Sequence, residues 1–294
     1  MSSVILAAVF AVFIWWFSTG IVLLLNGMQR RSYRFSLLIS TLLALAALYA
    51  LAHSAQQSST AAVYCSFTSA LLVWGWHELS FLTGWITGPR TTASAPGLAG
   101  WPRFVQAVRA ILWHELGIVA VGLLIVVMTW GAPNQVGTWT FLVLWSMRTS
   151  AKLNLFLGVR NLSEEFLPPH LSYMESFFRR RPMNPLFPFC VAGGAVVLGW
   201  MVLVAQRPET TAADVLGLTL AGTMLALAIL EHAMLVLPVS TSALWRWAMG
   251  QRQQQGHRAR GQADPRTTGD TPNALRADAA LPALDHDDKL LHAR

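Results

Sequence analysis

Seven apolar segments, each long enough to cross a membrane, follow one another along this chain of 294 residues. About 20 apolar residues in a helix span a hydrocarbon core of about 30 Å, and in lipid a spanning helix pairs its own backbone polar groups. The sequence therefore predicts an all-α, polytopic transmembrane helical bundle. The segments cover residues 3–25, 35–53, 61–86, 104–130, 137–158, 186–205 and 213–237.

The arginines gather in alternate loops and account for the net charge of +7. The loops after the first, third and fifth segments carry them, including three in a row at 179–181, whereas the other loops are nearly uncharged. Arginine-rich loops face the cytoplasm, so we expect a periplasmic N-terminus and a cytoplasmic C-terminus. This pattern points to a lipid bilayer as the surroundings and not to a nucleic acid.

The apolar character ends near residue 250, which divides the chain into two parts. Residues 1–250 form the predicted transmembrane domain, and residues 251–294 are rich in Gln, Arg, Asp, Ala and Pro. A segment with so few apolar side chains cannot bury enough surface to fold. We therefore expect residues 251–294 to be a disordered cytoplasmic tail.

The inner loop at 159–185 is predicted to contain a helix that lies on the membrane. After two prolines, Leu171, Met174 and Phe178 recur at helical spacing and are followed by the three arginines. An amphipathic segment with a basic end is typical of an interfacial helix. We expect its apolar side to face the lipid of the cytoplasmic leaflet.

Three pairs of adjacent histidine and glutamate residues interrupt the apolar segments. Ionisable side chains at membrane depth are costly and by default mark a functional site. Measured at about 1.5 Å per residue from the arginine-rich end of each segment, all three pairs lie at similar depth. The pairs are His77 with Glu78, His114 with Glu115, and Glu231 with His232.

The fifth segment adds Arg148 and Lys152, which are four residues apart and share one helix face. Two like charges on one face need anionic partners, so we expect the third, fourth, fifth and seventh segments to surround one polar centre. Polar residues of the same kind continue into the inner loop. The candidates for ion pairs or for binding a substrate carboxylate are Arg148, Lys152, Asn154, Arg160 and Asn161.

Three interpretations of the polar centre stay open at this stage. It is a structural network of ion pairs, a di-iron or di-manganese centre, or a site where a histidine is the axial ligand of a tetrapyrrole of the bacteriochlorophyll or haem type. The Glu-x-x-His spacing of ferritin-type metal sites is missing, and Trp74, Trp76, Trp113 and Trp145 are candidate walls for a tetrapyrrole. The candidate metal or tetrapyrrole ligands are His77, Glu78, His114, Glu115, Glu164, Glu165, His170, Glu231 and His232.

The middle of the chain resembles the PuhE family, the photosynthetic complex assembly proteins 2 of purple phototrophic bacteria. The resemblance rests on residues 147–162 (MRTSAKLNLFLGVRNL), 164–168 (EEFLP) and 183–188 (MNPLFP), and it extends over the whole membrane part. It implies a factor for assembly of the photosynthetic reaction centre and core light-harvesting complex, in the cytoplasmic or intracytoplasmic photosynthetic membrane.

The resemblance implies partners but no catalytic residues. The expected partners are reaction-centre and light-harvesting subunits or other assembly factors, together with bacteriochlorophyll or a precursor. The alternative function is a membrane metalloenzyme that modifies an intermediate of the bacteriochlorophyll pathway, with the imidazole and carboxylate groups as ligands. Whether the protein is an enzyme therefore stays open.

Overall fold

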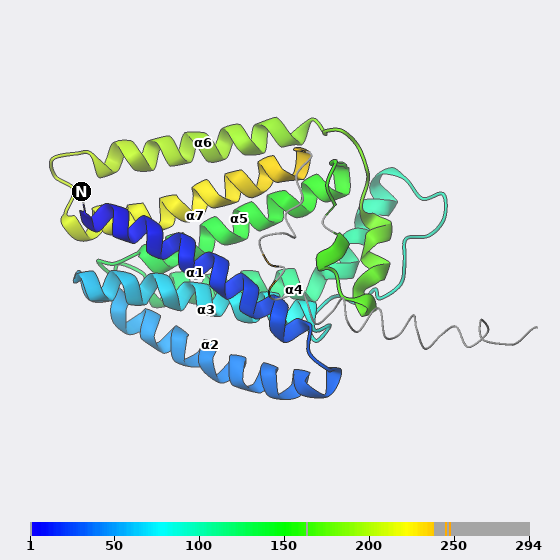
Figure 1. The fold of residues 1–294 in the computed structure, drawn as a ribbon, viewed down its shortest axis with the longest axis horizontal. Coiled ribbons are helices and arrows are strands. Elements are labelled where there is room, and N and C mark those ends of the chain that lie inside the picture. Colours follow the sequence, from blue (N-terminus) through cyan, green and yellow to red (C-terminus); the bar gives the residue numbers. More distant parts are fainter. Residues whose placement is uncertain (1, 163, 238–244, 246, 248–294) are drawn as a thin grey trace, which may run out of the picture. The chain divides into compact units, whose positions relative to one another are not determined.

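The computed structural model describes residues 2–162, 164–237, 245 and 247, and these residues form an all-helical bundle (Figure 1). Three short 3₁₀ helices, η1 (Arg30–Ser32), η2 (Glu164–Phe166) and η3 (Pro169–Phe177), lie in the connections. In this part of the chain the extended structure is limited to an isolated bridge between Val159 and Arg180. The long helices are α1 (Ser2–Asn26), α2 (Tyr33–Ala55), α3 (Thr60–Leu82), α4 (Gly100–Met128), α5 (Val136–Leu157), α6 (Leu186–Ala205) and α7 (Ala212–Val236).

Each predicted apolar segment forms one of these helices, so the predicted all-helical fold is confirmed. Hydroxyl caps fix two of the starting points, because Ser59 accepts the backbone N–H of Ala62 before α3 and Thr211 accepts that of Asp214 before α7. Five helices, α1, α2, α4, α6 and α7, are long and apolar enough to cross a membrane, which indicates a multi-pass membrane protein. The other two, α3 and α5, carry His77 and Glu78, and Arg148 and Lys152, respectively.

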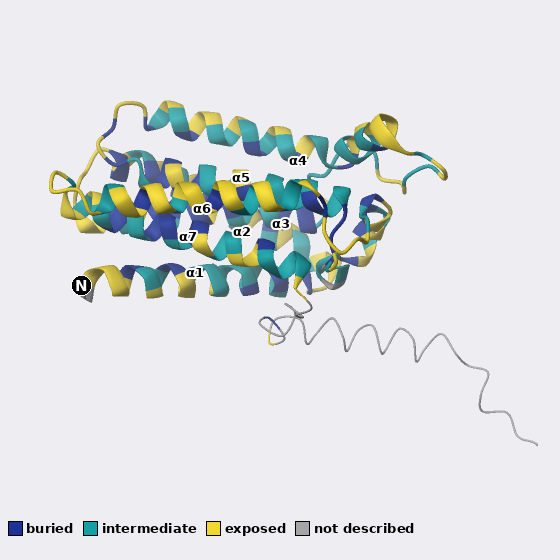
Figure 2. Cartoon of the chain, turned by 90° about the horizontal axis from the view of Figure 1, so that it is seen from above, coloured by how far each residue is buried: buried dark blue, intermediate teal, exposed yellow. Residues whose placement is uncertain are grey.

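The helix α3 lies at the centre of the bundle and packs against α1, α2, α5 and α7. The helix α6 packs mainly on α7, and α4 packs on α5 and α3. Phe67 of α3 and Leu220 and Met224 of α7 belong to the buried core between α1, α3 and α7. Large apolar side chains are exposed on the outer helices, and Figure 2 marks the exposed residues along these helices in yellow. Such faces suit contact with lipid.

The segment after the paired prolines differs from the predicted interfacial helix. It is the 3₁₀ helix η3, in which side chains three residues apart line up on one side. Leu171, Met174 and Phe177 therefore form its apolar side, whereas Phe178 already has an extended backbone. Leu171 and Met174 pack against Phe81 and Leu82 of α3. The apolar side of this segment thus faces the protein instead of the lipid.

The predicted disordered tail, residues 251–294, lies outside the described residues and stays a prediction. The side chain of Glu165 is also outside the described part of the structure, so its predicted role as a ligand stays a prediction.

Candidate functional site

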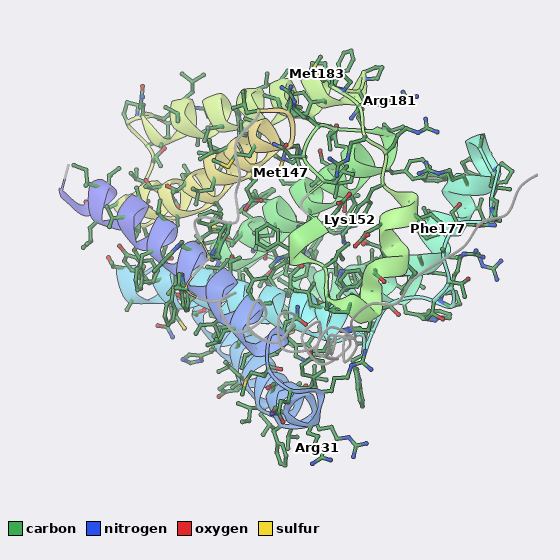
Figure 3. All side chains as sticks on the ribbon, turned by 45° about the vertical axis from the view of Figure 1, so that its right-hand side comes forward. Arg31, Met147, Lys152, Phe177, Arg181 and Met183 are labelled. Carbon is green, nitrogen blue, oxygen red and sulfur yellow. The ribbon has the colours of Figure 1, made fainter. Side chains whose placement is uncertain are left out.

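Charged side chains of α3, α4 and α5 meet in one cluster between these helices. Arg148 Nη2 lies 3.0 Å from Glu78 Oε2, and Lys152 Nζ lies 2.5 Å from Glu115 Oε1. Figure 3 shows Lys152 among the helices, whereas Arg31 projects from the edge of the bundle. One ion pair therefore links α5 to α3 and the other links α5 to α4.

Two buried histidines lie beside these ion pairs. The ring centres of His77 and His114 are 6.4 Å apart, and the residues are 2% and 1% exposed. His77 Nε2 and both ring nitrogens of His114 have no hydrogen-bond partner among the described residues. Glu78 Oε1 is also buried without such a partner. Each such group costs about 1–3 kcal/mol, so a cluster of them marks a place where a ligand or ordered water can bind.

Aromatic rings surround the two imidazoles. Trp76 and Phe141 lie 4.9 Å and 6.2 Å from His77 between ring centres, and Phe81 lies 4.5 Å from His114. The surroundings of the two histidines are therefore apolar on several sides.

The loop between α3 and α4 holds His114 in place through the backbone. The His114 N–H donates to Thr87 O at 2.9 Å, and the Arg90 N–H donates to Arg109 O at 3.2 Å. Gly88 permits this contact, because a Cβ atom there would lie 2.2 Å from Arg109 O. Sequence patterns did not indicate Thr87 or Gly88, although a glycine within a loop that touches a helix is a usable signal.

The third pair, Glu231 and His232, lies on α7 and has partners. Trp15 Nε1 donates to Glu231 Oε1 at 3.1 Å, which joins α7 to α1. His232 Nδ1 lies 2.8 Å from Ala228 O, so it carries the proton, and Nε2 accepts from Ser150 Oγ at 2.8 Å. Both nitrogens of His232 are thus used, and this histidine differs from His77 and His114.

The inner-loop candidates hold the loop itself together. His170 Nε2 lies 3.0 Å from Leu82 O, and Gly84, whose φ is 77°, leaves room for the His170 ring. Both Glu164 carboxylate oxygens accept from Arg180 Nη2, at 3.1 and 3.2 Å. These contacts join the inner loop to the end of α3 and to its own arginines instead of to the buried histidines.

The asparagine candidates also serve the backbone. Asn154 Nδ2 donates to Ser150 O at 2.9 Å, and Asn161 Nδ2 donates to Met234 O at 2.7 Å. Arg160 is exposed at the end of α5. Of the residues predicted to bind a substrate carboxylate, Arg148 is therefore the one within the cluster that keeps an open side, with 45% of its side chain exposed.

The donor set does not fit a di-iron or di-manganese centre. Within the described ranges, no three His, Cys, Asp or Glu side chains come close enough to hold a metal ion, and Glu78 and Glu115 each face a cation. A metal ion in a tetrapyrrole already has four nitrogen ligands and needs only an axial one. His77 and His114 each carry a ring nitrogen that has no hydrogen-bond partner among the described residues.

The predicted tryptophan walls are dispersed. Trp76 contacts the His77 ring, whereas Trp74 packs on Phe141 in the core and Trp113 is 53% exposed on α4. Trp145 packs against the same core as Trp74. The tryptophans thus belong to different surroundings and do not form one pocket.

The fold and the cluster define the class: a multi-pass helical membrane protein with ion-paired carboxylates and unpaired imidazoles among its helices. The chain belongs to the DUF3623 family, described as a protein of unknown function, which matches residues 1–256. It is also 38% identical over 251 residues to a Rhodobacter capsulatus protein described as an uncharacterized 30.4 kDa protein in the puhA 5′ region. That alignment covers 83% of this chain and 90% of the relative. No solved structure matches the chain.

Proposed function

We propose that this protein is an integral factor of the bacterial inner membrane that assists assembly of the photosynthetic reaction centre and core light-harvesting complex, and that it binds bacteriochlorophyll or a precursor during assembly. The setting is supported by the relative encoded in the puhA 5′ region, a location consistent with a photosynthesis gene cluster. The pigment is supported by one observation, the buried and unpaired nitrogens of His77 and His114.

The residues of the cluster have distinct roles in this proposal. His77 or His114 would hold the pigment through a ring nitrogen at its central metal, and the pigment would supply light absorption and redox chemistry once bound. Arg148 stays half-exposed and has N–H groups suited to an acidic substituent. Lys152 neutralises Glu115, so the partly buried carboxylate on α4 does not repel such a substituent. Apolar faces of the outer helices are the surfaces through which subunits of the complex would approach.

The alternative function, a di-iron or di-manganese enzyme acting on a bacteriochlorophyll-pathway intermediate, has less support. The described residues do not offer three metal ligands at one place. A pigment that brings its own metal needs fewer protein ligands, and this requirement suits the available imidazoles better.

Pigment binding to the full-length protein in detergent tests the ligand assignment. Bacteriochlorophyll a and its metal-free form are added separately, and absorption spectra are recorded after gel filtration. We expect the magnesium pigment to bind the wild type. Binding to His77→Leu or His114→Leu should be about tenfold weaker or more, because one strong contact is lost. His53→Leu, at the far end of α2, is the control. Equal binding by all variants, or equal binding of the metal-free pigment, contradicts axial ligation.

The assembly role requires a separate measurement in cells. A photosynthetic strain that lacks the gene is complemented with the wild type or with the same variants, and reaction-centre and light-harvesting absorption bands are quantified. We expect the bands to recover with the wild type and with His53→Leu. Full bands without any copy of the gene contradict the assembly role, whatever the pigment-binding result.

A further inference from the structure

We infer that the arginine-rich end of the bundle carries a binding pocket for the acidic headgroup of a membrane phospholipid. The pocket has a volume of about 280 Å³ and lies between the start of α4, the end of α5 and the segment that contains Arg179. Trp101, Arg103, Phe104 and Phe156 contribute to its walls. It is separate from the buried histidines, and the inference does not depend on the proposed role in assembly.

Two arginines line this pocket, and contacts within the protein position both of them. Arg103 is only 8% exposed, its guanidinium lies 4.6 Å from the centre of the Phe156 ring, and its Nη2 donates to Phe177 O at 2.7 Å. The backbone of Arg179 is fixed on both sides, because its N–H donates to Leu155 O and its carbonyl accepts from Val159, each at 3.1 Å. Arg103 is therefore held at the pocket by contacts of its side chain, and Arg179 lines the same pocket from a backbone position held by hydrogen bonds.

Neither arginine is neutralised within the described residues. The three ion pairs found there involve Arg148, Lys152 and Arg180. Two guanidinium groups that line the same small pocket repel each other, and an anion between them removes this repulsion. A phosphate group suits the site because guanidinium groups bind it through paired N–H groups in one plane.

The other walls indicate that the anion is part of a lipid. Phe104 and Phe156 pack edge to face with their ring centres 5.5 Å apart, and Trp101 stands beside Phe104 at 5.3 Å with 72% of its surface exposed. An exposed tryptophan next to arginines is typical of the membrane interface. A phospholipid places its phosphate at this level and its chains against the apolar rings, so it uses both kinds of wall.

Native mass spectrometry of the full-length protein with added phosphatidylglycerol tests this inference. We expect Arg103→Gln and Arg179→Gln each to weaken retention of the lipid about tenfold or more, as for loss of a hydrogen bond to a charged group. Arg109→Gln is the matched control, since it removes the same charge from an exposed position on α4. If the two pocket variants retain as much lipid as Arg109→Gln, the inference is wrong.

Two further measurements keep the result interpretable. Circular dichroism shows whether each variant folds. If Arg103→Gln does not fold, Arg179→Gln still tests the role of the positive charge in the pocket, because it preserves the bond between Arg103 and Phe177 O. Inorganic phosphate is added in place of the lipid, with the melting temperature of the wild type as readout. Stabilisation by the lipid but not by phosphate supports a lipid site, whereas equal stabilisation by phosphate alone would overturn the assignment to a lipid.

Discussion

Lys152 and Arg148 occupy successive turns of α5, yet the two cations have different surroundings. Lys152 is 20% exposed and contacts Glu115 of α4, whereas Arg148 contacts Glu78 of α3 and is 45% exposed. The first pair is the more enclosed and fastens α4 to the bundle. The second leaves part of a guanidinium available, so a ligand with an acidic group would meet Arg148 before Lys152.

Removal of one member of the enclosed pair is expected to destabilise the protein. Lys152→Met leaves the Glu115 carboxylate without its partner, at a cost of about 3 kcal/mol. The double variant Lys152→Met with Glu115→Gln removes both charges and recovers much of this loss. Thermal unfolding in detergent measures both effects. Arg180→Met breaks the exposed pair with Glu164 and is expected to cost less than about 1 kcal/mol; an equal cost for both single variants contradicts the argument.

The second prediction at this scale concerns Gly88. In Gly88→Ala the new methyl group meets the carbonyl of Arg109, so the loop must move away from α4 and release the backbone of His114. We expect a loss of about 1–3 kcal/mol in stability. Gly75→Ala is the control because no atom lies within 4 Å of the added methyl group. Melting temperatures of the two variants decide the matter, and a Gly88→Ala protein as stable as Gly75→Ala refutes the docking role of the loop.

Among the elements, α6 depends on small residues for its position. A Cβ atom at Gly194 would lie 3.1 Å from Ile229 of α7, whereas at Gly193 no atom lies within 4 Å. Adjacent glycines of one helix thus face different surroundings, one the neighbouring helix and the other the outside. Close approach through small residues is a general means of packing helices in membranes.

Gly194→Leu and Gly193→Leu form a matched pair that tests this packing. Gly194→Leu is expected to push α6 from α7 and to lower stability by about 1–3 kcal/mol. Gly193→Leu adds the same side chain on the free face and should change stability little. Unfolding in detergent, followed by circular dichroism, compares them. Similar losses for both would show that helix propensity, and not packing against Ile229, is responsible.

At the scale of the helical bundle, the described residues have an uneven distribution of charge from one end to the other. The connections after α1, α3 and α5 contain most of the loop arginines, and the alternation of helices brings them to the same end of the bundle (Figure 1). The polar cluster lies in the half nearer this end, because both Arg148 and Lys152 lie in the second half of α5, which ends at Leu157. Orientation in the membrane therefore decides from which side polar groups reach the cluster.

Reporter fusions test this orientation. Alkaline phosphatase is expected to be active when fused after Gly131 and inactive after Gly97 or Met183, and a cytoplasmic reporter such as green fluorescent protein should give the opposite pattern. Active phosphatase after Met183 would place the arginine-rich end outside. That result would also move the inferred lipid pocket to the other leaflet.

The bounds of the helices and the charges that they carry can be predicted from the amino-acid sequence alone. Apolar length predicts a spanning helix directly, since the bilayer sets the number of residues required. The cost of a charge in lipid likewise singled out the three His-Glu pairs together with Arg148 and Lys152. These are properties of composition along the chain, so they are visible before any packing is known.

Which of these groups form pairs and which have no partner among the described residues depends on how the helices pack. Adjacent helix residues point about 100° apart, so the sequence does not tell whether His77 or Glu78 faces a cation on another helix. Helix rotation and the docking of the 83–99 loop on α4 set these partners. Glu78 pairs with Arg148, whereas ring nitrogens of His77 and His114 have no partner among the described residues. His232 differs because Ser150 Oγ bonds to its Nε2. Packing also turned the apolar side of η3 toward α3, because three residues per turn replaced the expected α-helical period.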